Sequence, residues 1–188
     1  MEFVLITGPP AVGKMTVGQS LSKRLDYPLF INHDSIELTL KFFDFGEEGF
    51  NKINEGIREL IFKTCAASTD LKGLIFTFVW AFDQQEDSDY VDNLKNLFTQ
   101  NGGSFYIVEL YAPMDIRLDR NKTPNRLKAK PSKRNIAASD KRLQIGEKKY
   151  QMNTDGLQIK DKNYLRIDNS NLSPEEVVDQ IVEHFRLG

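Results

Sequence analysis

The sequence contains little cysteine and no strong excess of charge of one sign. Its one cysteine, Cys65, excludes an intramolecular disulfide and favours a reducing compartment. Lys and Arg together number 25 and Asp and Glu 27, so the net charge of −2 gives no general attraction to nucleic acid or to an anionic membrane. No apolar run approaches the roughly 20 residues that span a bilayer.

The start of the chain lacks a basic targeting segment, because Met1-Glu2 leads directly into an apolar run. The apolar content of 40%, with 13 Phe, is enough to form the core of one α/β domain. We therefore expect a single cytoplasmic domain over 1–188 that binds neither nucleic acid nor membrane. A monomer and a homodimer are both compatible with the sequence.

The sequence does contain a glycine-bounded lysine loop at 8–16, which reads Gly-Pro-Pro-Ala-Val-Gly-Lys-Met-Thr. An apolar run at 3–6 precedes it and an amphipathic stretch at 17–25 follows it, which indicates a strand, a loop and a helix. Such a loop directs backbone N–H groups at phosphate oxygens, the helix start adds a partial positive charge, and Lys14 adds a mobile one. We interpret it as a triphosphate site. The alternative is a Gly/Pro turn that carries a surface lysine by chance.

Apolar runs and helical patterns alternate along the rest of the chain. The predicted strands are 3–6, 28–32, 74–79, 105–110 and 164–168, and the predicted helices are approximately 17–25, 35–41, 48–67, 87–100, 114–121, 133–150 and 174–185. This alternation predicts a three-layer α/β/α sandwich with a central parallel sheet of about five strands. Ligands should bind beyond the carboxyl ends of those strands.

The residues after the loop lysine are Met15 and Thr16. A hydroxyl residue usually follows that lysine and helps to hold Mg²⁺, whereas the thioether of Met15 is a poor partner for a hard cation. Gly-Lys-x-Thr resembles the loop of adenylate kinases. The whole chain resembles the small-molecule and nucleotide kinase branch of the phosphate-loop proteins, which includes adenylate, shikimate and gluconate kinases and chloramphenicol phosphotransferase. The resemblance implies ATP and Mg²⁺ as cofactors, with Thr16 at the metal.

A dense group of cations follows the fourth apolar run. It comprises Arg117, Arg120, Lys122, Arg126, Lys128, Lys130, Lys133 and Arg134, against the single acid Asp119. The segment resembles the lid of the kinase family, and we place this small basic lid at approximately 121–134. The resemblance implies that Arg120 and Arg126 close over ATP, with Arg117 and Arg134 as weaker candidates. An exposed basic surface is the alternative. An RNA-binding arm is disfavoured because the segment lacks aromatic side chains.

The acceptor is expected to bind an insertion at approximately 33–60, as it does in the resembled family. Asp34 matches an aspartate that contacts the acceptor hydroxyl in shikimate and gluconate kinases, although Asp34 and Glu37 also form a capping-box pattern. His33 is adjacent, and Arg58 is suited to an anionic acceptor, although a surface position is the alternative. Trp80 and Asp83 follow the third apolar run, where a pocket wall and a metal-directing acid are needed; core packing and a helix cap are the alternative.

The turn after the last strand contains Asn169 and Asn171, where the resembled kinases enclose adenine. The next helix has a clear start, because Ser173 can cap it and Glu176 completes a capping box. The residues assigned to ATP are Gly8, Pro10, Ala11, Val12, Gly13, Lys14, Met15, Thr16, Arg117, Arg120, Asn169 and Asn171.

Together these features predict an ATP-dependent kinase that transfers the γ-phosphoryl group to a small-molecule or nucleotide acceptor. The predicted catalytic residues are Lys14, Asp34, Arg120 and Arg126, and the predicted acceptor residues are His33, Asp34, Arg58, Trp80 and Asp83. An ATP-binding regulatory module without a phosphoryl acceptor is the alternative. The sequence does not identify the acceptor, because fold-level resemblance carries no specificity.

Overall fold

The structure is a computed structural model of the chain and describes residues 1–154 and 159–188. The strands of this part are β1 (Glu2–Thr7), β2 (Leu29–Ile31), β3 (Gly73–Thr77), β4 (Ser104–Tyr111) and β5 (Tyr164–Asp168). They form one parallel sheet in the order β2-β3-β1-β4-β5. The predicted parallel sheet of about five strands is therefore confirmed.

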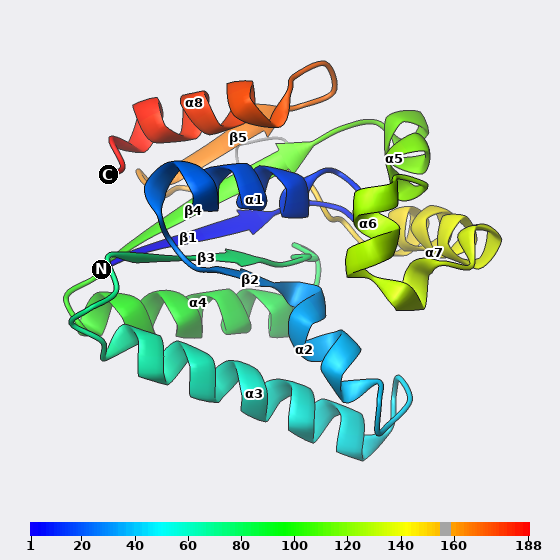
Figure 1. Ribbon diagram of the computed structural model, residues 1–188, viewed down its shortest axis with the longest axis horizontal. Coiled ribbons are helices and arrows are strands. Elements are labelled where there is room, and N and C mark those ends of the chain that lie inside the picture. Colours follow the sequence, from blue (N-terminus) through cyan, green and yellow to red (C-terminus); the bar gives the residue numbers. More distant parts are fainter. Residues whose placement is uncertain (155–158) are drawn as a thin grey trace.

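The helices of the described residues are α1 (Lys14–Leu25), α2 (Asn32–Thr39), α3 (Glu48–Ala66), α4 (Gln85–Gln100), α5 (Met114–Asn121), α6 (Pro124–Ala129), α7 (Ile136–Lys149) and α8 (Pro174–Phe185), with a short 3₁₀ helix, η1 (Pro131–Lys133). Helices α1 and α8 cover one face of the sheet, and α3 and α4 cover the other (Figure 1). This arrangement is the predicted three-layer α/β/α sandwich. Throughout 1–154 and 159–188, every helix is too short or too polar to cross a membrane.

The central strand β1 contributes to a core on both faces of the sheet, because successive side chains of a strand point in opposite directions. Val4 and Ile6 pack toward α1 and α8 in an aliphatic cluster, whereas Phe3 and Leu5 pack toward α3 and α4. The second cluster is rich in phenylalanine, and the Phe3 and Phe105 rings stack with their centroids 4.9 Å apart. These two cores fix the sheet, and the loops at its carboxyl edge are thereby held in place.

The carboxyl ends of the strands point toward α2, α5, α6 and α7, which lie together at one end of the molecule (Figure 1). Both chain termini lie at the opposite end (Figure 1). All strands are parallel, so each turn that follows a strand reaches the same edge. The loop at 8–13, the start of α2 and the turn after β5 are therefore brought to the same edge of the sheet, with the loop after the central strand β1 between the other two.

Two segments differ from the sequence prediction. Helix α2 begins at Asn32, three residues before the predicted start, and the carboxylate of Asp34 accepts the Ile31 N–H at 2.8 Å. Asp34 therefore caps from within the first turn, and the predicted capping pattern that pairs it with Glu37 is wrong. The basic segment forms α6 and η1, which the sequence analysis did not predict. By contrast, the Ser173–Glu176 capping box is confirmed at the start of α8.

Candidate active site

The glycine-bounded loop has a backbone that requires its glycines. Gly8 has φ of 127°, and a Cβ atom there would lie 2.3 Å from the Leu110 carbonyl oxygen on β4. Gly13 has φ of 118° and is the N-cap of α1, so Lys14 is the first helical residue. The loop therefore lies directly against β4 and leads into a helix N-terminus, where unpaired N–H groups favour an anion.

Lys14 lies across this loop. It is 8% exposed, and its Nζ donates to the carbonyl oxygens of Gly8 at 2.5 Å and of Pro9 at 2.8 Å. Burial holds the pKa of Lys14 well below its usual value, and the nearby charges of Lys130 and Arg126 act in the same direction. The ammonium group is therefore placed among other cations, an arrangement that an anionic ligand would stabilise.

A cavity of about 430 Å³ opens between this loop, α2, the turn after β5 and the segment α5–α7. Six cationic side chains line it: Lys14, Arg120, Arg126, Lys130, Lys133 and Arg142. Among the described residues, no Asp or Glu lines it. Cations so concentrated in a partly buried space repel one another unless an anion neutralises them, so the cavity is suited to a ligand with several negative charges.

Arg120 from α5 joins two walls of the cavity. Its Nη1 donates to the Val12 carbonyl at 2.8 Å and its Nη2 donates to the Asn169 carbonyl at 2.8 Å. The side-chain amide of Asn169 donates to the same Val12 carbonyl at 2.9 Å. Arg120 and Asn169 therefore hold the glycine-bounded loop against the turn after β5.

Arg126 and Lys130 extend from α6 and its C-terminal end into the cavity. The Nε of Arg126 donates to Asn121 at 2.7 Å, and burial lowers its pKa to about 10. Burial and the charges of Arg126 and Lys133 lower the pKa of Lys130 to about 7. The protonation of Lys130 is thus sensitive to any charge that enters the cavity.

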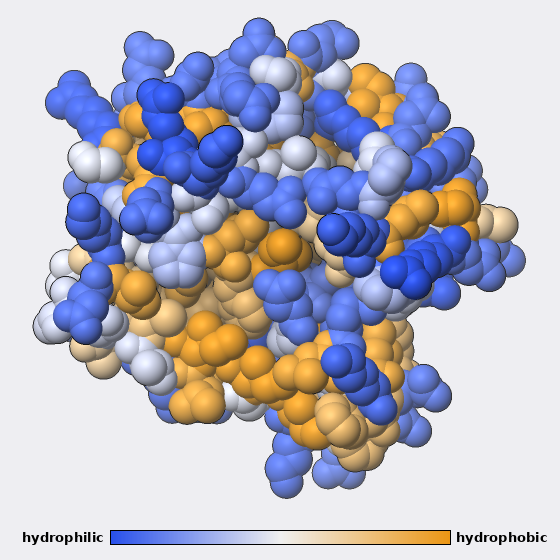
Figure 2. Space-filling view, viewed as in Figure 1, coloured by the Kyte–Doolittle hydropathy of each residue, from blue (hydrophilic) through white to orange (hydrophobic). Residues whose placement is uncertain are grey.

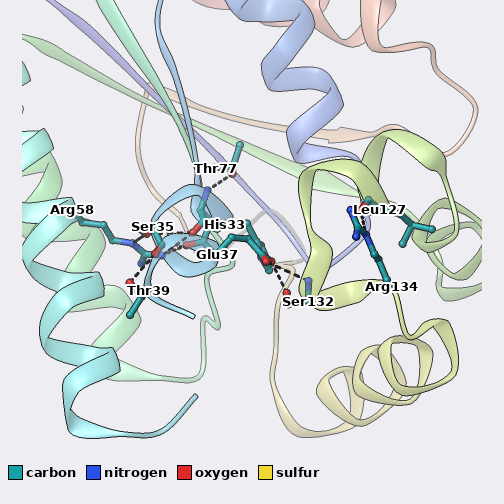
Figure 3. A network of polar contacts seen from close by, with 10 residues as sticks. His33, Ser35, Glu37, Thr39, Arg58, Thr77, Leu127, Ser132 and Arg134 are labelled. Carbon is teal, nitrogen blue, oxygen red and sulfur yellow. Dashed lines mark hydrogen bonds and ion pairs between the residues drawn. The ribbon is translucent and has the colours of Figure 1, made fainter. Parts of the chain in front are cut away.

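Helix α2 and η1 meet over the other side of the cavity through Glu37. The Glu37 carboxylate accepts from the Ser132 hydroxyl at 2.5 Å and the Ser132 N–H at 3.2 Å, and it pairs with His33 Nδ1 at 3.0 Å (Figure 3). His33 is one of the cavity residues. Burial, together with the charges of Lys130 and Lys133, lowers its pKa far below the usual range, so this imidazole is neutral near pH 7.

The structure brings most of the predicted nucleotide residues together. The predicted residues that line the cavity are Pro10, Ala11, Gly13, Lys14, Met15, Thr16, His33, Arg120, Arg126 and Asn169. Gly8 and Val12 lie behind them and present their carbonyl oxygens to Lys14 and Arg120. Asn171 is exposed in the turn before α8 and is not a cavity residue.

The predicted acceptor residues are mostly engaged elsewhere. Arg58 is 9% exposed, and its guanidinium donates to the Ser35 hydroxyl at 3.0 Å and the Asn32 carbonyl at 3.1 Å (Figure 3). The alternative of a surface arginine is therefore wrong, since Arg58 ties α3 to α2. Asp34 is outside the cavity lining and its Oδ2 is used in capping, but its carboxylate is close enough to Lys130 for the two charges to interact.

Trp80 and Asp83 also lie outside this cavity. The indole N–H of Trp80 donates to Ser88 at 3.2 Å, and an Asp83 oxygen accepts the Gln151 N–H at 3.1 Å. Arg117 is 1% exposed, donates to the Ala112 carbonyl at 3.0 Å and pairs with Glu147 of α7 at 2.6 Å. The contacts of these three side chains are with protein groups outside the cavity, so their observed role is structural.

The sequence analysis missed several cavity residues. Lys130 and Lys133 were listed in the basic segment but were given no role in the site, and Arg142 was not singled out. The density of lysine and arginine in the segment was a usable signal for the first two. Arg142 lies on α7, and which face of this helix points into the cavity depends on its packing against α5 and η1, which the sequence does not show.

Thr16, near the start of α1, is a cavity residue whose hydroxyl is suited to a phosphate-bound cation, and Thr77, Thr123 and Ser139 also line the cavity. Within the described part of the chain, no group of three or more His, Cys, Asp or Glu residues could hold a metal ion. A metal there would therefore depend on phosphate oxygens and water for most of its ligands, as Mg²⁺ commonly does.

Comparisons with known proteins show the fold. No protein family and no curated protein matches the sequence. Among solved structures, a gluconokinase from Sinorhizobium meliloti is 12% identical, with 98% of this chain and 91% of that chain covered and a TM-score of 0.58. A shikimate kinase from Acinetobacter baumannii in complex with shikimate is 18% identical, with 98% and 92% covered and a TM-score of 0.57.

The tunicamycin resistance protein of Deinococcus radiodurans is 20% identical, with 100% of this chain and 96% of that chain covered and a TM-score of 0.57. The chain therefore has the fold of the phosphate-loop small-molecule kinases over its whole length. Because all three sequence identities are low, the similarity shows the fold alone, and the chemistry of the site has to be inferred from the residues of the cavity.

Proposed function

We propose that the protein is an ATP-dependent kinase that transfers the γ-phosphoryl group of ATP to a small-molecule or nucleotide acceptor, with Mg²⁺. The observation that carries the proposal is the cavity, in which the glycine-bounded loop and six cations surround one space without an acid among its described lining residues. The kinase fold of the structural neighbours supports the same conclusion.

Each wall of the cavity has a distinct role in this proposal. The N–H groups of the loop and the start of α1 bind phosphate oxygens, and Lys14 leaves the Gly8 and Pro9 carbonyls to contact the outer phosphates. Thr16 holds Mg²⁺, which when bound neutralises charge on the phosphates. Arg120 and Asn169 fix the nucleotide side of the cavity.

We assign the segment 121–134 as the lid and 33–60 as the acceptor side. Arg126 and Lys130 neutralise negative charge that develops on the transferred group, and the closed lid excludes water. Asp34 uses its second carboxylate oxygen to orient the acceptor hydroxyl, with His33 beside it. Phosphoryl transfer needs positioning and charge stabilisation more than covalent chemistry, so these groups are sufficient.

The test is a coupled ADP-release assay over nucleoside monophosphates, sugar acids and hydroxylated carboxylic acids. Lys14→Ala should abolish release, and Lys23→Ala, an exposed lysine on the same helix, is the matched control. Thermal unfolding in the presence of ATP measures binding separately, since a ligand at about 100 times its Kd stabilises the folded state by about 2.7 kcal/mol. Stabilisation by ATP with no release for any acceptor would favour the regulatory module.

Replacement of Arg126 tests the assignment of the lid. Arg126→Ala should lower kcat by about 100-fold or more while the Kd of ATP rises by less than about fivefold, because the guanidinium acts on charge that develops during transfer. Steady-state kinetics and calorimetric ATP titration give the two values. Equal losses in both would assign Arg126 to ATP binding alone.

A further inference from the structure

Three phenylalanines between α2 and α3 are left in contact with water. Phe42 is 68% exposed, Phe45 52% and Phe43 38%, and Leu38 on the preceding helix is 43% exposed. We call Phe42, Phe43 and Phe45 the phenylalanine surface. Among the described residues it is the densest group of exposed large apolar side chains, and Figure 2 shows apolar atoms gathered over this corner of the molecule. Exposed apolar groups of this kind commonly mark a binding site.

The loop that carries these rings is held in shape by its own contacts. The Glu47 carboxylate accepts the Asp44 N–H at 2.8 Å, and Gly46 turns the chain with φ of 91°. One side of Phe45 packs on Phe50, with the ring centroids 4.8 Å apart. The exposed faces are therefore presented by an ordered loop, which lowers the entropy that a ligand must overcome on binding.

The phenylalanine surface adjoins the cavity. Lys133 lines the cavity, and its Nζ lies 5.7 Å from the centroid of the Phe45 ring. The adjacent Ser132 is bonded to Glu37 of α2, so η1 spans from the cavity to this loop (Figure 3). Figure 2 shows the surface hollowed between the region of α6 and α7 and the region of α2 and α3. A molecule that enters the cavity from this side passes the aromatic rings.

Cationic side chains and exposed aromatic rings therefore lie together on this side of the cavity. Lys130, Lys133 and Arg142 lie on the lid side of the cavity, and the phenylalanine surface lies immediately beyond Lys133. The cations are suited to an anionic group, and the rings are suited to an aromatic or acyl group. One ligand that satisfies both is amphipathic.

We propose that the phosphoryl acceptor is an anionic hydroxylated molecule with an aromatic or acyl group, which packs on Phe42, Phe43 and Phe45. The proposal rests on the kinase function proposed above and specifies the acceptor of that site. The hydroxyl and the anionic group enter the cavity beside Lys130 and Lys133, and the apolar group remains at the entrance. Phe42 and Phe45 are then the residues that determine specificity.

Binding can be tested without turnover by the anionic aromatic dye 1-anilinonaphthalene-8-sulfonate, titrated by fluorescence in the presence of a non-hydrolysable ATP analogue. The double variant Phe42→Ser, Phe45→Ser should raise the dye Kd by at least tenfold. Leu60→Ser is the matched control, because Leu60 is 69% exposed and lies about 18 Å along α3 from its start, at 1.5 Å per residue. An unchanged Kd in the double variant, or an equal change in the control, would overturn the proposal.

Turnover tests the same inference with matched acceptors. ADP release is compared within two pairs of acceptors. The first pair is lactate and 3-phenyllactate, and the second is 3-hydroxybutyrate and 3-hydroxydecanoate. The two members of each pair have the same hydroxyl and carboxylate groups and differ in the size of the apolar group. The apolar member should have a kcat/KM at least tenfold higher, and the double variant should remove that advantage while it leaves the Kd of ATP unchanged. Equal or better turnover of the polar members would overturn the apolar acceptor and leave the kinase function intact.

The two failures are distinguishable. If no acceptor is turned over and ATP binding is the same in the parent and in Lys14→Ala, the kinase function fails, and the dye titration still decides whether the phenylalanine surface binds an aromatic anion. Sedimentation of the parent and the double variant gives a further outcome. A dimer that the double variant converts to a monomer would assign the surface to a second copy of the chain and overturn the proposal.

Discussion

At the scale of single residues, the protonation of Lys130 makes the charge of the cavity depend on pH. Burial and the charges of Arg126 and Lys133 lower its pKa to about 7, so its protonation is sensitive to pH near neutrality. A phosphate placed beside it would raise this pKa toward its usual value. Because the bound state then holds more protons than the free state, ATP affinity should fall as the pH rises above 7.

We expect the parent to take up close to one proton with ATP at pH 8 and to lose ATP affinity by up to about tenfold per pH unit between pH 7 and 9. Lys130→Arg should reduce both effects, because arginine remains charged over this range, and any uptake that remains belongs to Lys14, whose pKa is also lowered. Calorimetric titration in buffers of different ionisation enthalpy measures the uptake. The same uptake in both proteins would assign the titration to another group.

The backbone at position 8 accommodates glycine and no residue with a side chain. A Cβ atom there would lie 2.3 Å from the Leu110 carbonyl oxygen, and φ of 127° is unfavourable for any residue with a Cβ. Gly8→Ala should therefore lower the free energy of unfolding by about 3 kcal/mol or more. Gly56→Ala is the control, because a Cβ atom added at this exposed position in the middle of α3 would meet no other element within 4 Å, and the substitution should be stabilising by roughly 0.5–1 kcal/mol. Urea unfolding measures both, and similar values for the two would contradict the strain at Gly8.

At the scale of elements, the contact between η1 and α2 ties the proposed lid to the acceptor side of the cavity. It consists of the two hydrogen bonds from Ser132 to Glu37 of α2, and the cation–π contact of Lys133 with Phe45 joins η1 to the loop after α2. Few groups share this contact, and it is partly open to water, so the lid should open more easily than the sheet unfolds.

Ser132→Ala removes one hydrogen bond worth about 1 kcal/mol, which corresponds to about a fivefold increase in the open population. Hydrogen exchange of amides in 124–134 should become faster by about that factor, while the free energy of global unfolding changes by less than about 0.5 kcal/mol. Ser104→Ala, an exposed serine at the start of β4, is the control. Unchanged exchange in the lid would show that Ser132 does not hold it.

The sequence predicted elements best where local signals and burial agree. Helix α8 has the bounds that Ser173, Pro174 and Glu176 indicate, and β5 has the predicted range 164–168. Helix α2 was misplaced because Asp34 can cap from two positions, and only its contact with the Ile31 N–H decides between them. The glycine-bounded loop between β1 and α1 could be predicted because its glycines and Lys14 lie within a few consecutive residues. The lid and acceptor sides depend on contacts between distant segments.

Arg58 and Arg117 illustrate the same limit within the candidate site. Each has the chemistry of an anion-binding residue, but Arg58 is engaged by Ser35 and Asn32, and Arg117 by Ala112 and Glu147. These partners come from other elements, so the sequence pattern does not show them. Lys130 is the reverse case, because its neighbours in the folded chain convert an ordinary lysine into a cavity group.

At the scale of the whole molecule, Glu109 joins the C-terminal third of the chain to the sheet. It is fully buried on β4, and its carboxylate accepts from Asn153, Thr154, Tyr164 and Arg166 at 2.6–3.3 Å. One side chain thus anchors the segment after α7 and the edge strand β5 at the same time. The position of the turn that carries Asn169 depends on this anchor.

Glu109→Gln should lower the free energy of unfolding by about 3–5 kcal/mol, because an amide N–H₂ would face donors and Arg166 would lose its ion pair. Tyr164→Phe, which removes one donor from the same carboxylate, should cost about 1–2 kcal/mol. Urea unfolding measures both variants. If Glu109→Gln lowers the free energy of unfolding no more than Tyr164→Phe does, the stabilisation by Glu109 comes from its hydrogen bond with Tyr164 alone.

Both termini lie at the end of the molecule opposite α5–α7 (Figure 1). A fluorescent protein fused to either end, or a surface to which either end is attached, would therefore stand away from the cavity and leave its entrance free. The molecule can in principle be immobilised by one end on a sensor chip with its pocket facing the solution, so that candidate acceptors can be screened as they flow past.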